Sequence, residues 1–500
     1  MCGVLGIVSS SAVASDLVVG LSALQHRGQD AAGIVTWSDR FHLHKGSGRA
    51  TRVFGDLDVH KELRGRIGIG HVRYATQGSA EVQDAQPVAV NYPLALAMAH
   101  NGNVTNFARL RTRLNREHHR LVETNNDVEL ILYTLAALLE RADLKRLGVP
   151  AVLAAVSALL DQVEGAYSVV AVVAGLGLLG FRDRHGIRPL VLGERRQGQG
   201  HSVALASEST VFDHLGFAVQ REVAPGEAVL VTLDGQVHCS APAPGPSHFC
   251  AFEFIYFARE DAVMNGARVA AQRIKAGRKL ADRVREAGLE PDIVIDVPNS
   301  AYFAATGLAE ALGLPYRRGL AQNPEFGRSF LHSTQAERER AVRQKLNPIR
   351  EVIADKKVAV VDDSIVRGTT SRHIVRLLRD CGAKAVYMLS AAPPVRFPCV
   401  YGIDIATRGE ILAAGLDTEQ IRLALGADAV VYQRLDDLQA LFGSTAGCYA
   451  CFSGVYPTPI DRSTLRQIES ERRHSRGDEL PGSATAAPAG DAAGSRTPSR

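Results

Sequence analysis

The second residue of this 500-residue chain combines features that could make it a nucleophile. Cys2 follows Met1 directly and precedes the apolar run Gly3–Val8. Removal of Met1 would leave a thiol and a free α-amine on one carbon, and an amine with a pKa of about 8 can take the thiol proton without a separate base residue. A secretory signal is disfavoured because the first basic residue, Arg27, comes well after the apolar run. A buried strand that begins with a small apolar residue stays open as an alternative.

The motif VVDDSIVRGTTS at residues 360–371 could bind a phosphorylated sugar. An apolar strand ends in Asp362 and Asp363, and a turn of Arg, Gly, Thr and Ser then opens a helix. Backbone N–H groups at a helix start form an anion site, and open α/β sheets bind ligands at the carboxyl ends of their strands. The two acids could accept hydrogen bonds from sugar hydroxyls or help to hold Mg²⁺. A simple capped helix is the alternative, but two adjacent acids followed by RGTTS favour a binding site.

Four of the seven cysteines could hold a metal centre. Cys448 and Cys451 form a C-x-x-C pair, a pattern shared by zinc, redox and iron–sulfur sites. A zinc site would need a second pair, whereas Cys250 and Cys399 stand singly. Four thiolates from scattered positions suit a [4Fe–4S] cluster.

The elements that must position these residues change character midway along the chain. Residues 2–239 contain short strand-like runs and two helical stretches, around Asp127–Arg141 and Val149–Gln162. This pattern predicts a layered α+β domain with helices covering sheets. Ser240–Ser247 is rich in Pro and Gly, which indicates a linker.

The remainder of the chain predicts a second domain and a tail. In residues 250–460, a helix expected over Val263–Glu286 leads into alternating strands and helices. Such alternation is typical of an α/β domain with a mostly parallel sheet. Residues 482–500 consist largely of Ala, Gly, Ser and Pro with little to bury, so we expect a disordered tail.

Composition narrows the class of protein further. The chain is 46% hydrophobic and 22% charged, which is ordinary for a soluble globular protein. Crossing a bilayer takes about 20 consecutive apolar residues, and since the chain lacks such a stretch we expect no membrane partner. A net charge of +4 is too small to indicate nucleic acid but suits small anionic substrates. An odd cysteine count without a secretory signal argues against a disulfide framework and for the cytoplasm.

The VVDDSIVRGTTS motif resembles the signature of the phosphoribosyltransferases, whose substrate is phosphoribosyl pyrophosphate with Mg²⁺. The resemblance implies that Asp362 and Asp363 contact the ribose hydroxyls and the metal ion, with Ser300 as a further magnesium residue. Ser300 ends the sequence VPNS, which resembles the family's pyrophosphate loop V-P-D-S-G, with Asn299 and Ala301 as departures. The implied cradle for the 5′-phosphate consists of Arg367, Gly368, Thr369, Thr370 and Ser371.

The first half resembles the N-terminal-nucleophile glutamine amidotransferases, in which the leading cysteine attacks the side-chain amide of glutamine. Cys2 begins a matching Cys-Gly-Val, and the motif HNGN matches one in which Asn101 and Gly102 supply the oxyanion hole. The motif GHVRYAT implies that Arg73 binds the glutamine α-carboxylate bidentately, and Asp127 stands at the position that binds the α-amino group. The full set of implied glutamine-binding residues is Arg27, Arg73, Thr76 and Asp127. The implied fold is a layered α/β/β/α sandwich.

Together the two halves, over nearly all of residues 2–460, resemble the iron–sulfur-containing branch of the amidophosphoribosyltransferase family. The resemblance implies that glutamine is hydrolysed in the first half and that its ammonia displaces pyrophosphate from phosphoribosyl pyrophosphate in the second. The products would be 5-phosphoribosylamine, glutamate and pyrophosphate, in the first committed step of purine (IMP) synthesis. A homo-oligomer, dimer or tetramer, inhibited by purine nucleotides is also implied. The implied ligands of a structural cluster are Cys250, Cys399, Cys448 and Cys451.

One segment departs from the family pattern. Relatives usually carry a mobile loop reading K-N-R-Y-x-G-R-T-F, and the corresponding segment here is Gln322–Phe330. Gln322 and Pro324 replace two basic residues, and Glu325 adds an acid beside a polyanionic substrate. Arg328 remains as an expected phosphoribosyl-pyrophosphate-binding residue. Because closure of such a loop completes the site, we expect a working enzyme with weaker affinity for this substrate.

Two other functions compete with this interpretation. The first is a glutaminase coupled to a different acceptor, which the DDSIVRGTTS motif disfavours. The second is a phosphoribosyl-pyrophosphate-sensing regulator, which would have no use for Cys2 and a glutamine pocket.

Overall fold

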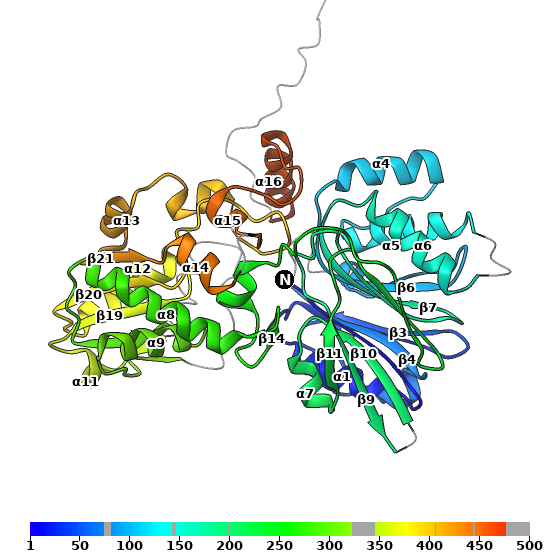
Figure 1. The fold of residues 1–500 in the computed structure, drawn as a ribbon, viewed down its shortest axis with the longest axis horizontal. Helices are drawn as coiled ribbons and strands as arrows, with labels where there is room; N and C mark the ends of the chain where they lie inside the picture. Colours follow the sequence, from blue (N-terminus) through cyan, green and yellow to red (C-terminus); the bar gives the residue numbers. More distant parts are fainter. Residues whose placement is uncertain are drawn as a thin grey trace, which may run out of the picture.

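The computed structural model describes residues 1–74, 82–142, 147–198, 200–322, 346–405, 407–443 and 446–476. Figure 1 shows two parts, each built around its own sheets, with the N-terminus of the chain between them. Thr76, Arg328 and the tail over 482–500 lie outside the described residues.

Two antiparallel sheets form the centre of the first part. The larger sheet has the order β11-β9-β10-β1-β4-β2-β3 and the smaller one the order β13-β12-β8-β7-β6-β5. The strands of the larger sheet are β1 (Gly3–Ser9), β2 (Ala31–Trp37), β3 (Phe41–Ser47), β4 (Ile67–Arg73), β9 (Val191–Gln197), β10 (Gly200–Ala206) and β11 (Ala218–Glu222). Those of the smaller sheet are β5 (Val88–Val90), β6 (Leu96–Val104), β7 (Gly165–Val173), β8 (Gly177–Arg182), β12 (Ala228–Thr232) and β13 (Val237–Cys239).

Alternating side chains bury both faces of the larger sheet. On β1, Val4 and Val8 join the core that lies between the two sheets, whereas Leu5 and Ile7 join the core beneath the helices on the outer face. This period of two follows from the pleat of a strand and explains why β1 is apolar at nearly every position. The outer helices on this side are α1 (Ala14–Ala23), α2 (Ala50–Val53), α3 (Val59–Glu62) and α7 (Thr210–Leu215).

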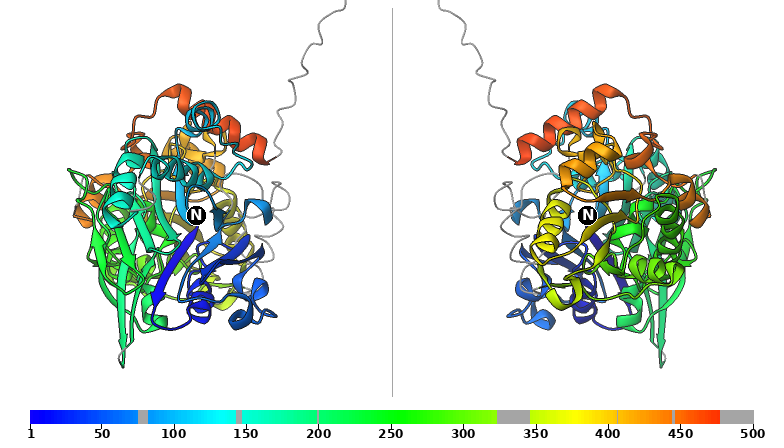
Figure 2. Two further views of the ribbon diagram at one scale, coloured as in Figure 1. Left: turned by 90° about the vertical axis from the view of Figure 1, so that its right-hand side faces the viewer. Right: turned by 90° about the vertical axis from the view of Figure 1, so that its left-hand side faces the viewer.

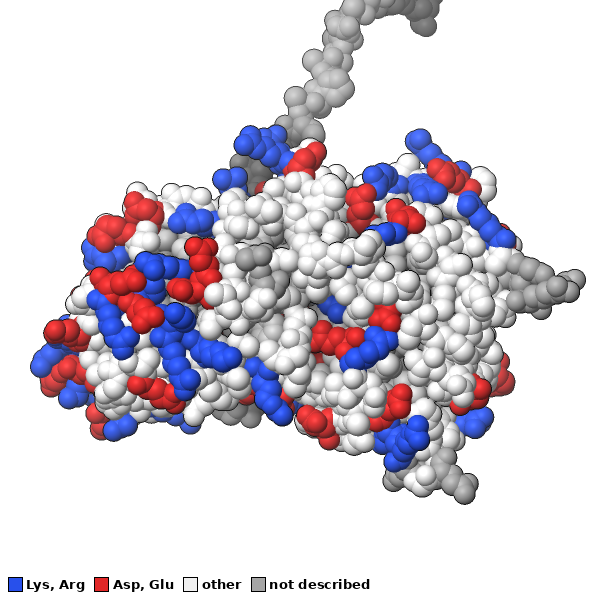
Figure 3. All heavy atoms as spheres, viewed as in Figure 1, with Lys and Arg blue, Asp and Glu red and all other residues white. Residues whose placement is uncertain are grey.

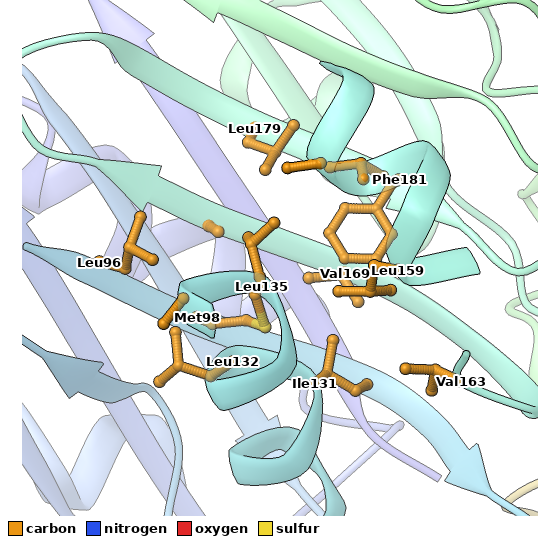
Figure 4. Close-up of a cluster of buried hydrophobic side chains, with 14 of the residues drawn as sticks. Leu96, Met98, Ile131, Leu132, Leu135, Leu159, Val163, Val169, Leu179 and Phe181 are labelled. Atoms are coloured by element: carbon orange, nitrogen blue, oxygen red, sulfur yellow. The ribbon is translucent and has the colours of Figure 1, made fainter. Parts of the chain in front are cut away.

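Three helices belong to the side of the smaller sheet: α4 (Phe107–His118), α5 (Asp127–Leu139) and α6 (Val149–Leu160). Figure 4 shows Ile131, Leu132 and Leu135 of α5 pointing at the sheet side chains, among them Met98 and Phe181. The two expected helical stretches are thus confirmed as α5 and α6, and the first part has the expected helix–sheet–sheet–helix layers.

A parallel sheet forms the centre of the second part, in the order β16-β19-β20-β21. Its elements are α8 (Val269–Glu286), β16 (Ile293–Asp296), α9 (Tyr302–Leu312), α11 (Arg350–Ile353), β19 (Lys357–Asp362), α12 (Thr369–Asp380), β20 (Ala385–Ser390), α13 (Thr418–Leu425), β21 (Ala429–Tyr432) and α14 (Leu435–Leu441). On β19, Ala359 and Val361 pack with α8 and α9 on one face, and Val358 and Val360 pack with α12 and α13 on the other. Burial on both faces is what a parallel sheet requires.

The helix expected over Val263–Glu286 is shorter than the sequence suggested. Its first six residues form a hairpin of β14 (Val263–Met264) and β15 (Ala267–Arg268), and α8 begins only at Val269. Asn265 and Gly266 connect the two strands with positive φ angles of 45° and 69°. Asn-Gly is the preferred pair for such a tight turn, and this local preference overrides the helical periodicity.

The junction between the two parts has an apolar core of its own. It combines Ala166 and Ile187 of the first part with Tyr401 and the four expected cluster cysteines of the second. The short α15 (Ala450–Ser453) carries Cys451, and Ile468 of α16 (Arg462–Arg476) joins the same core. Figure 2 shows α16 (red) at the top of the molecule, on the same side as α4. Two short strands, β17 (Leu320–Gln322) and β18 (Leu346–Pro348), pair beside the parallel sheet.

Charged side chains of both signs lie on the surface of the protein. On the face shown in Figure 3, basic and acidic side chains are interleaved, so no continuous field of one sign covers it. No helix among the described residues is long and apolar enough to cross a membrane.

Candidate active site

The start of β1 holds Cys2 beside the strand that carries the HNGN motif. Its backbone N–H donates to Asn101 Oδ1 at 3.2 Å, and its thiol donates to the Tyr74 carbonyl at 3.6 Å. Burial lowers the pKa of the Met1 α-amine to about 5.

Asn101 and Gly102 lie on β6 next to Cys2. The Asn101 side chain is fully buried, and its Nδ2 has no hydrogen-bond acceptor among the described residues. Gly102 has a φ of +151°, and a Cβ there would lie 1.9 Å from the Ala166 carbonyl oxygen, so a larger residue would not fit. A buried donor without an acceptor, set beside a nucleophile, is what stabilisation of an oxyanion requires.

Two buried charged residues lie on either side of this strand. Antiparallel pairing sets Gly3 opposite Val72, which brings Cys2 beside Arg73 at the end of β4. Asp127 is the first residue of α5; its Oδ2 accepts from the Val104 N–H at 2.9 Å, and its Oδ1 lies 3.0 Å from His100 Nε2. Each carboxylate oxygen therefore has a protein contact, and its second lone pair can accept another hydrogen bond.

Arg27, expected at the glutamine pocket, is fully buried and has other partners. Its Nε donates to the Cys2 carbonyl at 3.1 Å, its Nη2 donates to Glu253 Oε1 at 2.7 Å, and its Nη1 donates to Glu208 Oε1. These contacts occupy three of the five guanidinium N–H groups and tie Arg27 to the main chain at Cys2. We keep the expected glutamine contact of Arg27 as a proposal, and we add a proposed positioning role in which Arg27 fixes the main chain at Cys2.

The charges around Arg27 extend across the junction. Glu253 Oε1 also accepts from Arg188 Nη1 at 3.3 Å, and Arg188 Nε donates to the Tyr401 carbonyl at 2.8 Å. Neither Glu253 nor Arg188 was expected at the site from the sequence. A usable signal was present, because Glu253 is a single acid within the aromatic run FCAFEFIYF, and a buried acid needs a buried cationic or hydrogen-bonding partner.

A cavity of about 160 Å³ lies between the two parts and brings the expected sugar-phosphate residues together. Its polar lining includes Ser300, Asp362, Asp363, Arg367, Gly368, Thr369, Thr370 and Ser371. Parallel pairing sets Asp296 of β16 beside Val361 of β19, so the segments after both strands meet, and the Ser300 hydroxyl donates to Asp363 Oδ2. Gly368 precedes α12 with a φ of +73°, which leaves the helix N-terminus facing this cavity.

Tyr74 connects Cys2 with this cavity. Its carbonyl accepts from the Cys2 thiol, its ring lines the cavity, and its hydroxyl donates to Asp404 Oδ2 at 3.2 Å. The cavity wall also contains Phe252, Tyr256 and Phe257. Tyr74 is thus a single residue that lies between Cys2 and the cavity. No sequence motif indicates this relation.

The four expected cluster cysteines are buried and unpaired in disulfides. Cys250 forms a β-bridge with Cys448, and the Cys451 carbonyl accepts from the N–H groups of Arg396 and Phe397, which lead to Cys399. Burial raises the pKa of the Cys250 thiol to about 11 and those of Cys448 and Cys451 well above their usual value, and the charges of the neighbouring cysteines add to the effect. Such mutual influence requires close approach, so three separate segments bring the cysteines together.

The donors fit the expected metal groups by type. Four clustered thiols match a [4Fe–4S] cluster, and the oxygens of Ser300, Asp362 and Asp363 match Mg²⁺. Within the described residues, no group of three or more His, Cys, Asp or Glu side chains is already arranged to hold a metal ion.

Comparisons with known proteins agree with this geometry. The model of the glutamine amidotransferase domain family matches residues 71–214. A curated amidophosphoribosyltransferase of Pasteurella multocida (strain Pm70) is 43% identical over 487 residues, which cover 94% of this chain and 96% of that protein. The curated amidophosphoribosyltransferase of Escherichia coli (strain K12) is 42% identical over 484 residues, with the same coverage. The chain belongs to the amidophosphoribosyltransferase family.

Solved structures show the amidophosphoribosyltransferase fold in this chain. The glutamine phosphoribosylpyrophosphate amidotransferase from B. subtilis, complexed with ADP and GMP, matches with a TM-score of 0.80 and 36% identity over 92% of this chain and 98% of that one. A structure described as the allosteric regulatory enzyme of purine biosynthesis matches with a TM-score of 0.82 and 36% identity over 94% and 99%. The fold is thus an N-terminal-nucleophile glutaminase domain followed by an α/β phosphoribosyltransferase domain, as expected. We keep the boundaries 2–239 and 250–460 as a proposal.

Proposed function

We propose that this chain converts glutamine, 5-phosphoribosyl 1-pyrophosphate and water into 5-phosphoribosylamine, glutamate and pyrophosphate, the first committed step of purine synthesis. The observation that carries the proposal is the cavity between the two parts, which Tyr74 joins to Cys2 and which the acidic and hydroxyl residues of the second part line. The test is to measure pyrophosphate and glutamate in the presence of both substrates and of each alone. Release of pyrophosphate only when both substrates are present, with one glutamate formed per pyrophosphate, would support the proposed reaction. Glutamine hydrolysis without any pyrophosphate release would favour a different acceptor.

In the first half, the residues around Cys2 suit hydrolysis of an amide. The freed α-amine takes the thiol proton, and the sulfur attacks the side-chain carbonyl carbon of glutamine. Asn101 Nδ2 and the Gly102 N–H stabilise the oxyanion, while Arg73 and Asp127 hold the α-carboxylate and the α-ammonium group. Collapse of the intermediate releases ammonia with the returned proton, and water then frees glutamate from the thioester.

A substitution at Asn101 tests this part. In Asn101→Ala and the isosteric Asn101→Asp variants, we expect glutamine-dependent turnover to fall roughly 100- to 1,000-fold, the typical cost of removing one oxyanion donor. Synthesis from free ammonia should not change, and the exposed Asn115→Ala on α4 is the control. Steady-state kinetics with each nitrogen source measure the effect. Equal losses with both nitrogen sources would show that Asn101 supports the fold and not the oxyanion.

In the second half, ammonia attacks C1 of the sugar as the bond from C1 to pyrophosphate breaks, and the product amine loses one proton. The start of α12 and the hydroxyls of Thr369, Thr370 and Ser371 hold the 5′-phosphate. Asp362 and Asp363 accept hydrogen bonds from the ribose hydroxyls. Mg²⁺ bound by these acids and Ser300 would neutralise charge on the pyrophosphate. The aromatic wall of the cavity excludes water, which would otherwise compete with ammonia.

We also propose that Cys250, Cys399, Cys448 and Cys451 hold a structural [4Fe–4S] cluster. Support comes from their common burial at the junction and from the absence of a zinc-like second C-x-x-C pair in the sequence. A cluster there would tie the C-terminal segment to the start of the second domain. It would also lie near the main chain that contacts Asn103, whose Nδ2 donates to the Val400 carbonyl at 2.9 Å.

Protein purified without oxygen is expected to be brown and to contain about four irons and four inorganic sulfides per chain. Cys451→Ser should lower the iron content and the stability, whereas Cys239→Ser, at an exposed cysteine, should alter neither. Metal analysis and thermal unfolding measure these outcomes. Stoichiometric zinc without inorganic sulfide would contradict the cluster.

Three further properties belong to the proposal. Purine nucleotides are proposed as inhibitors, since the related B. subtilis structure contains ADP and GMP. We also propose that the protein forms a homo-oligomer and is located in the cytoplasm. Nothing in the comparisons favours the regulator or another acceptor.

A further inference from the structure

A buried amide lies behind the residues proposed to bind glutamine. We infer that Gln86 is a positioning residue for the glutamine site, because its side chain fixes the tautomer of His100 whose Nε2–H faces Asp127. Gln86 is 2% exposed and His100 is 3% exposed, so water does not compete for their contacts. The inference rests on the proposed role of Asp127 at the α-ammonium group of glutamine.

Two independent contacts show which end of the Gln86 amide is which. The His100 backbone N–H must find an acceptor, and Gln86 Oε1 lies 2.8 Å from it. Asn126 Oδ1 already accepts from the Val128 N–H at 3.2 Å, so it is an oxygen, and Gln86 Nε2 lies 3.2 Å from it. Oxygen and nitrogen of the Gln86 amide are therefore assigned from both sides.

The orientation of the amide sets the proton on His100. Gln86 Nε2 lies 3.0 Å from His100 Nδ1 and can only donate, so Nδ1 is an acceptor without a proton. The alternative, donation from Nδ1 to Gln86 Oε1, is longer at 3.4 Å and would compete with the backbone N–H already bound there. A neutral imidazole with a bare Nδ1 carries its proton on Nε2.

That proton faces a carboxylate. His100 Nε2 lies 3.0 Å from Asp127 Oδ1, although the oxygen lies off the direction of the ring N–H, so the contact is electrostatic attraction more than an aligned hydrogen bond. The reversed tautomer would turn a lone pair toward the carboxylate and repel it. This repulsion would displace the Asp127 carboxylate. Its second oxygen and remaining lone pairs would then no longer be placed to bind an ammonium group.

The main chain around Gln86 is held rigidly, as a positioning residue requires. At Gly33 of β2, a Cβ would lie 2.2 Å from the Gln86 carbonyl oxygen, which shows how closely this segment is pressed onto the sheet. Lys45 Nζ donates to the neighbouring Ala85 carbonyl at 2.8 Å, and Asn126 Nδ2 donates to the Asp84 carbonyl at 2.7 Å. The amide thus cannot move away from His100 without disturbing the contacts with Gly33, Lys45 and Asn126.

The test replaces the amide by a carboxylate of the same shape. In Gln86→Glu at pH 8, both side-chain oxygens accept, so His100 Nδ1 must take a proton; an exchange between amide and carboxylate at a histidine is known to reverse its tautomer. We expect the KM for glutamine to rise about tenfold or more, with a smaller change in kcat, because a binding group and not the nucleophile is disturbed. The control is Gln420→Glu on α13, where the side chain only accepts, from the Asp417 N–H, and a carboxylate fits.

A spectroscopic measurement keeps the inference testable even if the variant folds poorly. Histidine labelled with ¹⁵N in the ring distinguishes protonated from bare nitrogens, and loss of one signal in His100→Asn assigns the residue. The wild-type protein should show a bare Nδ1 and a protonated Nε2 on His100, and Gln86→Glu should show the reverse, a protonated Nδ1 and a bare Nε2. A protonated Nδ1 in the wild type, or an unchanged KM in a folded Gln86→Glu variant that retains ammonia-dependent activity, would overturn the inference. Absence of glutaminase activity in the wild type would instead contradict the proposed function.

Discussion

Replacement of Cys2 by alanine is expected to abolish formation of 5-phosphoribosylamine from glutamine and to leave its formation from free ammonia largely intact. The thiol is the group proposed to form the covalent intermediate, and Asn101 and Gly102 have nothing to stabilise without it. The residues proposed to contact the phosphate and the sugar come from a different part of the chain, around Ser300 and Asp363, and do not include Cys2. Pyrophosphate release, measured with glutamine and then with ammonium chloride at high pH, separates the two activities.

Two further variants sharpen this result. Cys239→Ala, at an exposed cysteine, should keep both activities. A chain that retains Met1 should be inactive with glutamine, because the Cys2 nitrogen is then an amide and cannot act as a base. Loss of both activities in a folded Cys2→Ala protein would mean that the two chemistries are not divided between the two domains.

The opposite separation is expected when the acidic pair is neutralised. In an Asp362→Asn, Asp363→Asn variant, synthesis should fall below detection with either nitrogen source, while hydrolysis of glutamine to glutamate continues. The asparagine amides keep the shape of the side chains but replace one carboxylate oxygen of each with a donor. The hydroxyls of Ser300 and Ser364 donate to different oxygens of Asp363, so the substitution also removes the acceptor of one of them.

The matched control is Asp380→Asn at the exposed end of α12, which should leave both activities unchanged. Glutamate and pyrophosphate are measured separately, and binding of phosphoribosyl pyrophosphate by calorimetry shows whether the loss is in affinity or in turnover. Normal synthesis from ammonia by the double variant would remove the acidic pair from the proposed transfer site.

Contiguous motifs and hydrophobic periodicity were enough to predict many of the helices and strands and several candidate site residues. The 3.6-residue period predicted α5 and α6, and the alternation of strands and helices in the second half predicted a parallel sheet, since both patterns depend on neighbours in the sequence. The sequence also suggested Asn101 and the acidic pair, because each belongs to a short motif whose residues stay together in any fold. Where two local preferences competed, as at Asn265–Gly266, the turn prevailed over the helix.

Two pairs of partners that are far apart in the sequence were decided by the tertiary structure alone. Arg27 meets Glu253 across 226 positions, and Tyr74 meets Asp404 across 330. The role of Gln86 follows from its distances to His100 and Asn126, which no motif encodes. Burial is the physical reason: a buried polar or charged group must find a partner, but which partner it finds depends on how strands pair and how two domains meet.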